Sequence, residues 1–298
     1  MRAVHASFTL NLASLILKLT SAVNATSVAV NAELLHSLGD TVGSGLLVLG
    51  LSISKRDPSI RYPFGFGRAI YVFGLIASAI FGGFLFAITT ISGIQQLILL
   101  NDVLPSTTSV ASLTIALILD IAVLLWGLVE FRKMPRDPAS RGTLVENLAD
   151  TIGGFAALTS LITRSPWIDG VGALVVSAIL LSSSALLSYR YFEILVGRSA
   201  PKNVVGRVVK IALSDPRIID VNDVKSLIVG SNEYLIVLQV EVPETTSVKE
   251  ADSIRGELSE RIREKLPEVK YVVIEFQKPT SPSMSFKKIL KEVITLGD

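Results

Sequence analysis

The chain has 298 residues, of which half are hydrophobic and only 18% are charged, and its mean hydropathy is +0.56. Because soluble domains carry about 25% charged residues, this composition excludes an ordinary soluble globule and predicts an integral membrane protein. The formal net charge of +2 is too small to indicate a nucleic acid partner. With no cysteine, disulfides and thiolate sites are excluded, so any metal ion must be bound by oxygen or imidazole.

Six apolar segments have the length of about 20 residues that a helix needs to cross the hydrocarbon core of a bilayer. They are predicted at Phe8–Val30, Asn31–Ser54, Ala69–Leu100, Ser109–Val129, Thr143–Ile162 and Trp167–Tyr189. No small-residue cleavage pattern precedes the first segment, so we interpret it as a transmembrane helix and not as a signal peptide. The sequence thus predicts a membrane α-helical bundle of six transmembrane helices.

Basic residues in the links between these segments indicate the orientation. The links after the second and fourth segments contain Lys55, Arg56, Arg61 and Arg68, and Arg132, Lys133, Arg136 and Arg141. The other links hold few charges, namely Asp102, and Arg164 with Asp169. The positive-inside rule therefore predicts that both termini are cytoplasmic, and we expect a multi-pass protein of the plasma membrane.

After Tyr189 the sequence changes from apolar to charged, which marks a domain boundary. A helix opens with Pro201 in its first turn. Two β-rich runs follow, at Val221–Val229 and Tyr234–Val242, and the short polar segment between them predicts a hairpin.

A second amphipathic helix and a third strand complete this part of the chain. Ser247 and Glu250 have the spacing of a capping box, and the helix they begin extends to about Leu266. Tyr271–Phe276 is the third strand. The order α-β-β-α-β predicts a ferredoxin-like or metallochaperone-like α+β domain, with two helices on one face of a three-stranded sheet.

These changes of pattern divide the chain into three parts. Residues 1–195 are expected to form a transmembrane domain, and residues 196–279 a cytosolic α+β domain. Residues 280–298 are expected to form a C-terminal amphipathic helix or tail.

Two pairs of polar residues stand out in the apolar segments. His36 and Asp40 are four residues apart in the second segment, and Glu146 and Asp150 repeat that spacing in the fifth. On a helix this spacing puts both members of a pair on one face. A carboxylate at mid-membrane depth costs about 2.5 to 3.5 kcal/mol on insertion scales, so it needs a partner or a cavity.

Imidazole and carboxylate groups are ligands of divalent cations, so four such groups from two helices can enclose one ion. Small residues beside both pairs allow the helices to approach closely. These residues are Gly39, Gly43, Gly153 and Gly154. The alternative is that the four polar groups are structural contacts between helices.

Other ionisable residues also lie in the apolar segments. Lys18 and Asp120 are expected at the same depth in the membrane, which predicts a buried ion pair between them. The alternative is that Asp120 acts as a proton relay. Glu33 lies on the same helix face as His36 and Asp40, nearer the outer end. One alternative is that it guides an exiting cation or carries a proton, and the other is that it anchors the outer end of its helix.

Several motifs resemble the cation diffusion facilitator family. They are His36–Asp40 in the second segment, Tyr62–Arg68 in the following loop, the pair in the fifth segment, Trp167–Asp169, and Leu195–Pro201. The resemblance covers nearly the whole chain to about Pro279. It implies a homodimeric transporter that exports divalent transition metals from the cytoplasm in exchange for protons, with His36, Asp40, Glu146 and Asp150 as the intramembrane transport site.

The sequence departs from the family pattern in its ligand types. Relatives that transport zinc most often carry His or Asp at the position of Glu146, so this set has one imidazole and three carboxylates. More oxygen shifts the preference toward manganese or iron, while the imidazole retains zinc and cobalt. The cytosolic part contains no histidine, and Asp252 and Glu275 stand where the family often has regulatory metal ligands.

The leading prediction is therefore a metal cation/proton antiporter that works by alternating access, with zinc the favoured substrate. Protonation accounts for the coupling, since a metal ligand must lose its proton to bind, and His36 is the natural proton carrier because histidine has an ordinary pKa of about 6.5. We expect no enzymatic activity and no prosthetic cofactor. A membrane-anchored metal sensor without transport is the alternative, and an ion channel is a third class.

Overall fold

The computed structural model describes residues 2–133 and 138–279, and the chain divides into two compact units. One unit contains the chain up to Leu47 and Gly74–Tyr189, and the other contains Val48–Phe73 and the chain from Arg190 onward. The predicted C-terminal helix at 280–298 lies outside the described residues.

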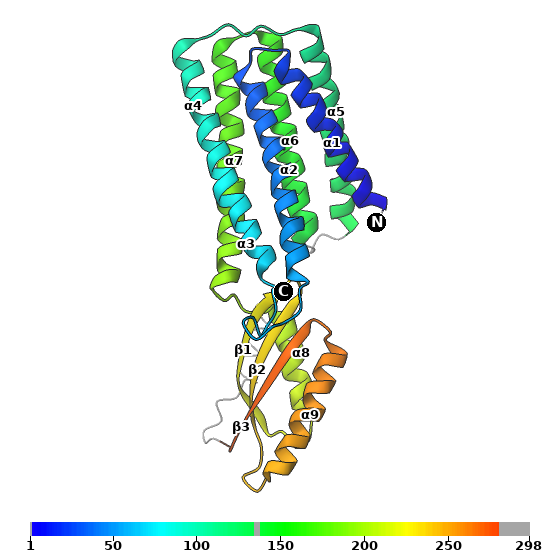
Figure 1. Cartoon of the computed structure of the whole chain (residues 1–298). Helices are drawn as coiled ribbons and strands as arrows, with labels where there is room; N and C mark the ends of the chain where they lie inside the picture. Colours follow the sequence, from blue (N-terminus) through cyan, green and yellow to red (C-terminus); the bar gives the residue numbers. More distant parts are fainter. Residues whose placement is uncertain (1, 134–137, 280–298) are drawn as a thin grey trace. The chain divides into compact units, whose positions relative to one another are not determined.

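Long helices make up the first unit, and Figure 1 shows them as a bundle. The helices are α1 (Arg2–Val23), α2 (Val28–Ser54), α3 (Ala69–Ile76), the π-helical segment η1 (Ala77–Gly82), α4 (Gly83–Leu99), α5 (Thr107–Lys133), α6 (Pro138–Thr163) and α7 (Pro166–Val196). Four helical stretches of the described chain are long and apolar enough to cross a membrane, and a shorter apolar stretch ends α1. These stretches are Val28–Ser54, Ala69–Leu99, Thr107–Val129, Pro166–Val196 and the shorter Leu12–Val23.

The break between the first two helices lies earlier than the sequence predicts. We expected the boundary after Val30, but α1 ends at Val23 and α2 begins at Val28. The first amides of a helix lack partners within the helix, and here the carboxylate of Asp169 accepts bonds from the amides of Val28 and Ala29, at 2.9 and 3.1 Å. The hydroxyl of Ser27 also accepts a bond from the amide of Val30 at 3.2 Å, so a local cap and a residue distant in sequence together hold the start of α2.

The third predicted segment is one continuous helical stretch with an irregular centre. It runs from Ala69 to Leu99, but η1 is wound as a π-helix between α3 and α4. Gly82 packs so closely against Ser184 of α7 that any side chain at this position would collide with it. The stretch ends at Leu100, whose φ of 51° is left-handed.

In the second unit, a three-stranded sheet is covered by two helices. Its elements are, in chain order, α8 (Lys202–Leu213), β1 (Asp220–Gly230), β2 (Glu233–Glu241), α9 (Val248–Lys265) and β3 (Val269–Gln277). The strands lie in the order β1-β2-β3, with β1 and β2 antiparallel and β2 and β3 parallel. A parallel pair needs a crossover connection, and α9 provides it.

One apolar core explains the arrangement of these elements. Alternate residues of β2, such as Ile236 and Leu238, are fully buried, as a strand with one covered face requires. They belong to the same core as Val208 of α8 and Leu258 of α9, so both helices cover the same face. As predicted, Ser247 caps α9, because its hydroxyl accepts a bond from the amide of Glu250 at 3.3 Å.

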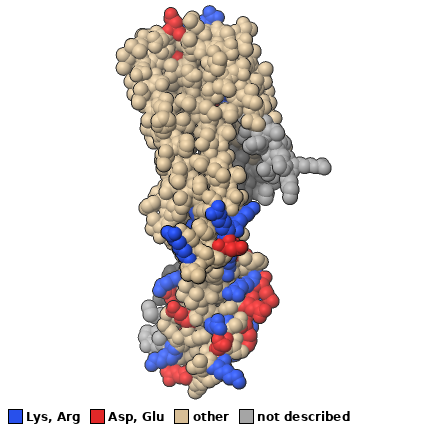
Figure 2. All heavy atoms as spheres, viewed as in Figure 1, with Lys and Arg blue, Asp and Glu red and all other residues tan. Residues whose placement is uncertain are grey.

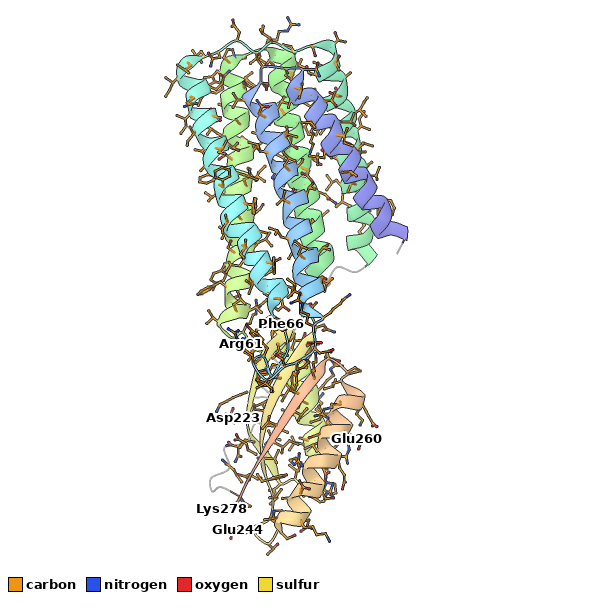
Figure 3. All side chains as sticks on the ribbon, in the orientation of Figure 1. Arg61, Phe66, Asp223, Glu244, Glu260 and Lys278 are labelled. Atoms are coloured by element: carbon orange, nitrogen blue, oxygen red, sulfur yellow. The ribbon has the colours of Figure 1, made fainter. Side chains whose placement is uncertain are left out.

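Charged side chains project from the surface of this unit. Figure 3 labels several of them, including Glu244 and Glu260, which are both exposed. Figure 2 shows Lys, Arg, Asp and Glu side chains gathered over the sheet and its helices, whereas the visible face of the bundle is mostly uncharged.

The loop between α2 and α3 packs on the β1–β2 hairpin within the second unit. Arg68 Nε donates to the carbonyl of Ile228 at 3.0 Å, and the hydroxyl of Tyr71 donates to the carbonyl of Gly230 at 2.9 Å. Gly67 lies so close to Val229 that a side chain there would collide with the strand. The glycine-rich loop therefore reaches the backbone of β1 directly.

Candidate metal centre

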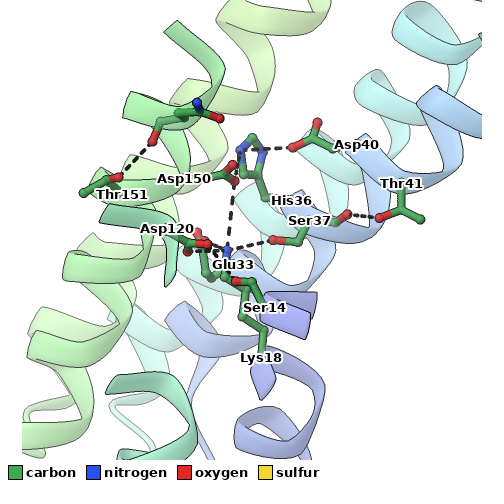
Figure 4. Close-up of polar contacts among 11 residues, drawn as sticks. Ser14, Lys18, Glu33, His36, Ser37, Asp40, Thr41, Asp120, Asp150 and Thr151 are labelled. Atoms are coloured by element: carbon green, nitrogen blue, oxygen red, sulfur yellow. Dashed lines mark hydrogen bonds and ion pairs between the residues drawn. The ribbon is translucent and has the colours of Figure 1, made fainter. Parts of the chain in front are cut away.

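Three of the four predicted ligands converge between α2 and α6 (Figure 4). His36 Nε2 lies 3.4 Å from Asp150 Oδ1 and 3.6 Å from Asp40 Oδ2. One ligand atom of each of the three residues lies within 4.8 Å of the others. The spacing of His36 and Asp40 on one helix face thus meets a carboxylate from a helix more than 100 residues further along the chain.

These distances fit a divalent ion. A tetrahedral zinc site with bonds of about 2.1 Å has ligand atoms about 3.4 Å apart, which is close to the two separations from His36 Nε2. His36 is only 3% exposed, and neither of its ring nitrogens has a hydrogen-bond partner among the described residues. His36 Nε2 instead faces the oxygens of Asp40 and Asp150 at ion-pair distance, and a bound cation would give the three groups a common partner.

The fourth predicted ligand, Glu146, lies in α6 one turn before Asp150. Its side chain is outside the described part of the structure. The geometry therefore brings together His36, Asp40 and Asp150, and Glu146 stays a prediction from the sequence.

Close packing of α2 and α6 depends on a glycine. A side chain at Gly153 of α6 would collide with the carboxylate of Glu33 on α2. Gly39 of α2 instead faces α4, since a Cβ there would lie 2.7 Å from Leu85 Cδ1. Small residues thus allow close approach on two sides of α2.

A second polar cluster lies beside the three ligands. Lys18 Nζ of α1 is 3.0 Å from Asp120 Oδ2 of α5, so the predicted ion pair is present. The same ammonium group is 2.7 Å from Glu33 Oε1 and 4.0 Å from Asp150 Oδ1. It also donates to the hydroxyl of Ser37 at 2.9 Å. Lys18 therefore connects four helices, and one of the carboxylates around it belongs to the candidate metal centre.

The position of Glu33 differs from one of the two expectations. A residue that anchors the outer end of a helix would reach water, but Glu33 is fully buried and bonded to Lys18. The sequence pattern did not reveal this partner, because Lys18 was matched by depth to Asp120 alone.

The structural role of Asp169 was not predicted. It was counted among the charges of a link and belongs to the Trp167–Asp169 motif, and the structure buries it fully in the first turn of α7. Its carboxylate accepts hydrogen bonds from the hydroxyls of Ser27 and Ser160, at 2.6 and 2.5 Å, in addition to the two amides of α2. An aspartate at the start of an apolar helix, after Trp167 and Ile168, was the available signal.

Asp252 and Glu275 do not belong to any group of metal-ligating side chains among the described residues. Asp252 is paired with Arg255 at 2.7 Å, and Glu275 accepts a bond from Gln239 at 3.4 Å. Because the domain has no histidine, any metal site in it would have to use carboxylates, and the geometry of these two gives no support for one.

Comparison with known proteins identifies the family. Residues 4–196 match the model of the cation efflux transmembrane domain, and residues 200–278 match that of the cytoplasmic domain of cation efflux proteins. The chain therefore belongs to the cation efflux family, also called the cation diffusion facilitators, whose members are multi-pass membrane proteins.

Named relatives include transporters of known cargo. The Xenopus laevis protein named proton-coupled zinc antiporter SLC30A9, mitochondrial, is 31% identical over 245 residues, which are 75% of this chain and 43% of that protein. The Homo sapiens protein of the same name is 28% identical over 235 residues, covering 72% and 41%. Metal tolerance protein 3 of Oryza sativa subsp. japonica is 24% identical over 278 residues, covering 91% and 67%. The chain spans about two fifths of the length of the SLC30A9 proteins.

Proposed function

We propose that this protein exports divalent transition-metal cations from the cytoplasm in exchange for protons by alternating access, with zinc as the favoured substrate. The observation that carries the proposal is the convergence of His36, Asp40 and Asp150 between two helices of the bundle. The names of the SLC30A9 relatives, which are proton-coupled zinc antiporters, support the same function.

The substrate site consists of His36, Asp40 and Asp150, with Glu146 as the fourth ligand from its spacing in the sequence. One imidazole with three carboxylates suits zinc, and it also accepts manganese, iron or cobalt, because oxygen ligands favour harder ions. The metal ion is a transported substrate here and not a resident cofactor.

Proton exchange follows from the chemistry of the ligands. A cation binds only to deprotonated imidazole and carboxylate groups, so metal loading releases protons and proton binding releases the metal. His36 is the proposed carrier, because its Nε2 lies within 3.6 Å of Asp40 and Asp150, so that a proton on this nitrogen and a metal ion shared with the carboxylates exclude one another. Glu33 and Asp120 are assigned to neutralising Lys18 and not to a proton relay, since both lie within 3.0 Å of its ammonium group.

The proposed architecture is a homodimer in which each chain spans the membrane six times and has both termini in the cytoplasm. Residues 1–195 carry transport, and residues 196–279 dimerise. The charge asymmetry of the links supports this orientation, and the match to the cytoplasmic domain model supports the dimer. We propose the plasma membrane as its location, and membrane fractionation tests this against the mitochondrial location in the names of the SLC30A9 relatives.

Transport is tested in proteoliposomes that contain a pH-sensitive dye. Zinc, manganese, iron, cobalt and cadmium are supplied in turn under an imposed proton gradient, with wild type, Asp150→Ala and the matched control Asp102→Asn, which changes an exposed carboxylate. We expect one or more metals to move against proton flow in the wild type and the control, and no movement in Asp150→Ala.

Two results would contradict the proposal. Metal binding without any transport would identify a membrane-anchored sensor. Metal flux that follows the electrochemical gradient without a pH signal would identify a channel. Size-exclusion chromatography with light scattering tests the dimer, which a monomeric mass would refute.

A further inference from the structure

The ammonium group of Lys18 occupies a place where oxygen atoms from separate helices converge (Figure 4). Glu33 Oε1 and Ser37 Oγ of α2 lie 2.7 and 2.9 Å from Lys18 Nζ. Asp120 Oδ2 of α5 lies 3.0 Å away. Lys18 is only 1% exposed, so its charge is held inside the bundle by these oxygens and not by water.

The oxygens around Lys18 have capacity for a stronger cation. Glu33 is fully buried, and its Oε2 has no hydrogen-bond partner among the described residues; the same holds for the Oδ2 of Asp120, which faces Lys18 only as an ion pair. Asp120 Oδ1 accepts a bond from Ser14 at 2.7 Å, which fixes the orientation of this carboxylate. Two carboxylates and a hydroxyl thus surround one point, which is the donor set of an ion that prefers oxygen.

This cluster adjoins the candidate metal centre through one shared group. Asp150 Oδ1 is 3.4 Å from His36 Nε2 and 4.0 Å from Lys18 Nζ. The same carboxylate oxygen therefore faces the position of the transported ion on one side and the lysine charge on the other.

We propose that Lys18 is a specificity-determining residue whose tethered ammonium group fills a second cation position, so that the bundle binds one divalent ion per chain and not two. Glu33, Asp120 and Ser37 form this position, and Asp150 borders it. Removal of the lysine side chain leaves an oxygen-lined site for a hard divalent cation such as Mn²⁺.

The distances favour this substitution of one cation for another. An ammonium nitrogen lies about 2.8 Å from carboxylate oxygen, whereas hard divalent ions bind oxygen at about 2.0 to 2.6 Å. The oxygens must therefore move inward by about 0.2 to 0.8 Å. Without Lys18 the buried carboxylates have no counter-charge, and buried charges require pairing or a metal ion.

The experiment counts Mn²⁺ ions bound by the full chain in detergent, with electron paramagnetic resonance of free Mn²⁺ as the readout. Lys18→Ala is compared with wild type, with Lys18→Arg, which keeps the charge, and with Lys55→Ala, which removes an exposed lysine. We expect one additional Mn²⁺ per chain in Lys18→Ala alone. The triple variant Lys18→Ala/Glu33→Gln/Asp120→Asn is expected to bind the same number as the wild type.

Equal Mn²⁺ counts in wild type and Lys18→Ala would overturn the inference and would show that Lys18 serves only as a structural ion pair. Because the lysine charge is buried, Lys18→Ala is purified both with and without Mn²⁺, and Lys18→Ser repeats the test. If neither variant folds even with Mn²⁺ present, the inference also fails, since a divalent ion must then be unable to replace the ammonium group.

The inference rests on the proposed function, but the two fail in different ways. A wild type that transports metal while Lys18→Ala gains no ion contradicts only the role of Lys18. A wild type that transports nothing while Lys18→Ala gains an ion contradicts only the antiporter. A wild type and a variant that both bind no Mn²⁺ contradict both, because the bundle then contains no cation position.

Discussion

The two units of this chain differ most in what they expose. In the unit with the sheet, the core cluster is apolar and most charged side chains lie on the surface, although Asp215 and Glu241 are buried. In the helical unit, Lys18, Glu33 and Asp169 are buried, while Phe84 and Ile98 expose 62% and 73% of their surface. Burial of apolar side chains stabilises the first kind of unit, but lipid is as apolar as leucine, so the second kind depends on packing and on polar contacts between helices.

The substitution with the largest expected effect, in Asp40, tests whether the polar groups of the helical unit serve transport. Asp40→Asn keeps the size of the side chain but removes the charge of a ligand. Because loss of a group that only supports a metal ligand already lowers affinity 10- to 100-fold, we expect zinc transport in proteoliposomes to fall by at least about 100-fold. Transport within twofold of the wild type would exclude Asp40 as a ligand.

A smaller change tests whether helix packing in this unit depends on the buried charges. Gly153→Ala puts a methyl group against the carboxylate of Glu33, which must then leave Lys18. Breaking a buried ion pair costs about 3 to 5 kcal/mol, so we expect a marked fall in the thermal unfolding temperature in detergent. Gly83→Ala is the matched control, because nothing lies within 4 Å of its new Cβ, and an equal effect of both changes would contradict the explanation.

The start of α2 provides the next test. Asp169→Asn removes the charge from a group that accepts bonds from two hydroxyls and two amides. Hydrogen bonds to charged groups contribute about 1.5 to 3 kcal/mol each, and the amide oxygen retains some of them, so we expect a loss of about 2 kcal/mol in stability. Thermal unfolding with Asp102→Asn as control measures it, and unchanged stability would show that Asp169 does not hold α2.

The sheet unit is expected to respond less, and in a manner that depends on pH. Hydrogen bonds from Arg217 to Asp215, at 2.8 and 2.9 Å, lower the pKa of that carboxyl to about 2. A lowered pKa contributes stability above the unfolded pKa of about 3.9, and this stability is lost as the pH falls toward 2. Since the Arg217 side chain is 34% exposed, solvent weakens the pair, and we expect a contribution of about 1 kcal/mol.

Asp215→Asn in the full chain tests this contribution. Hydrogen exchange of peptides from α8 and β1 should increase in the variant at pH 6, and the difference from the wild type should shrink as the pH falls from about 4 to about 2. A difference that stays constant with pH would show that the charge of Asp215 is not the cause.

The comparison of the two units also explains what could be predicted from the sequence. In the sheet unit, the alternation of β2 and the cap of α9 are local signals, so Tyr234–Val242 was predicted within one residue of Glu233–Glu241. In the helical unit, the pairs at four-residue spacing predicted that His36, Asp40 and Asp150 lie together, because a charge in an apolar segment needs a partner or a cavity.

What could not be predicted depends on how helices are rotated and offset along their axes. The membrane depth expected from the sequence paired Lys18 with Asp120, but only the structure shows that Glu33 and Ser37 contact the same ammonium group. Similarly, the first amides of α2 donate to Asp169 from another helix, in addition to the local cap by Ser27. Contacts of this kind leave no periodic signal in the chain.

The π-helical segment η1 has a consequence for the length of the chain. A π-turn closes its hydrogen bonds over one more residue than an α-turn, so residues 77–82 hold one residue in excess of a regular helix. A chain shorter by one residue within this segment could therefore form an uninterrupted α-helix while α3 and α4 keep the faces they present now. A single-residue deletion within residues 77–82 is therefore expected to convert the π-helical segment to α-helix without rotating α3 relative to α4.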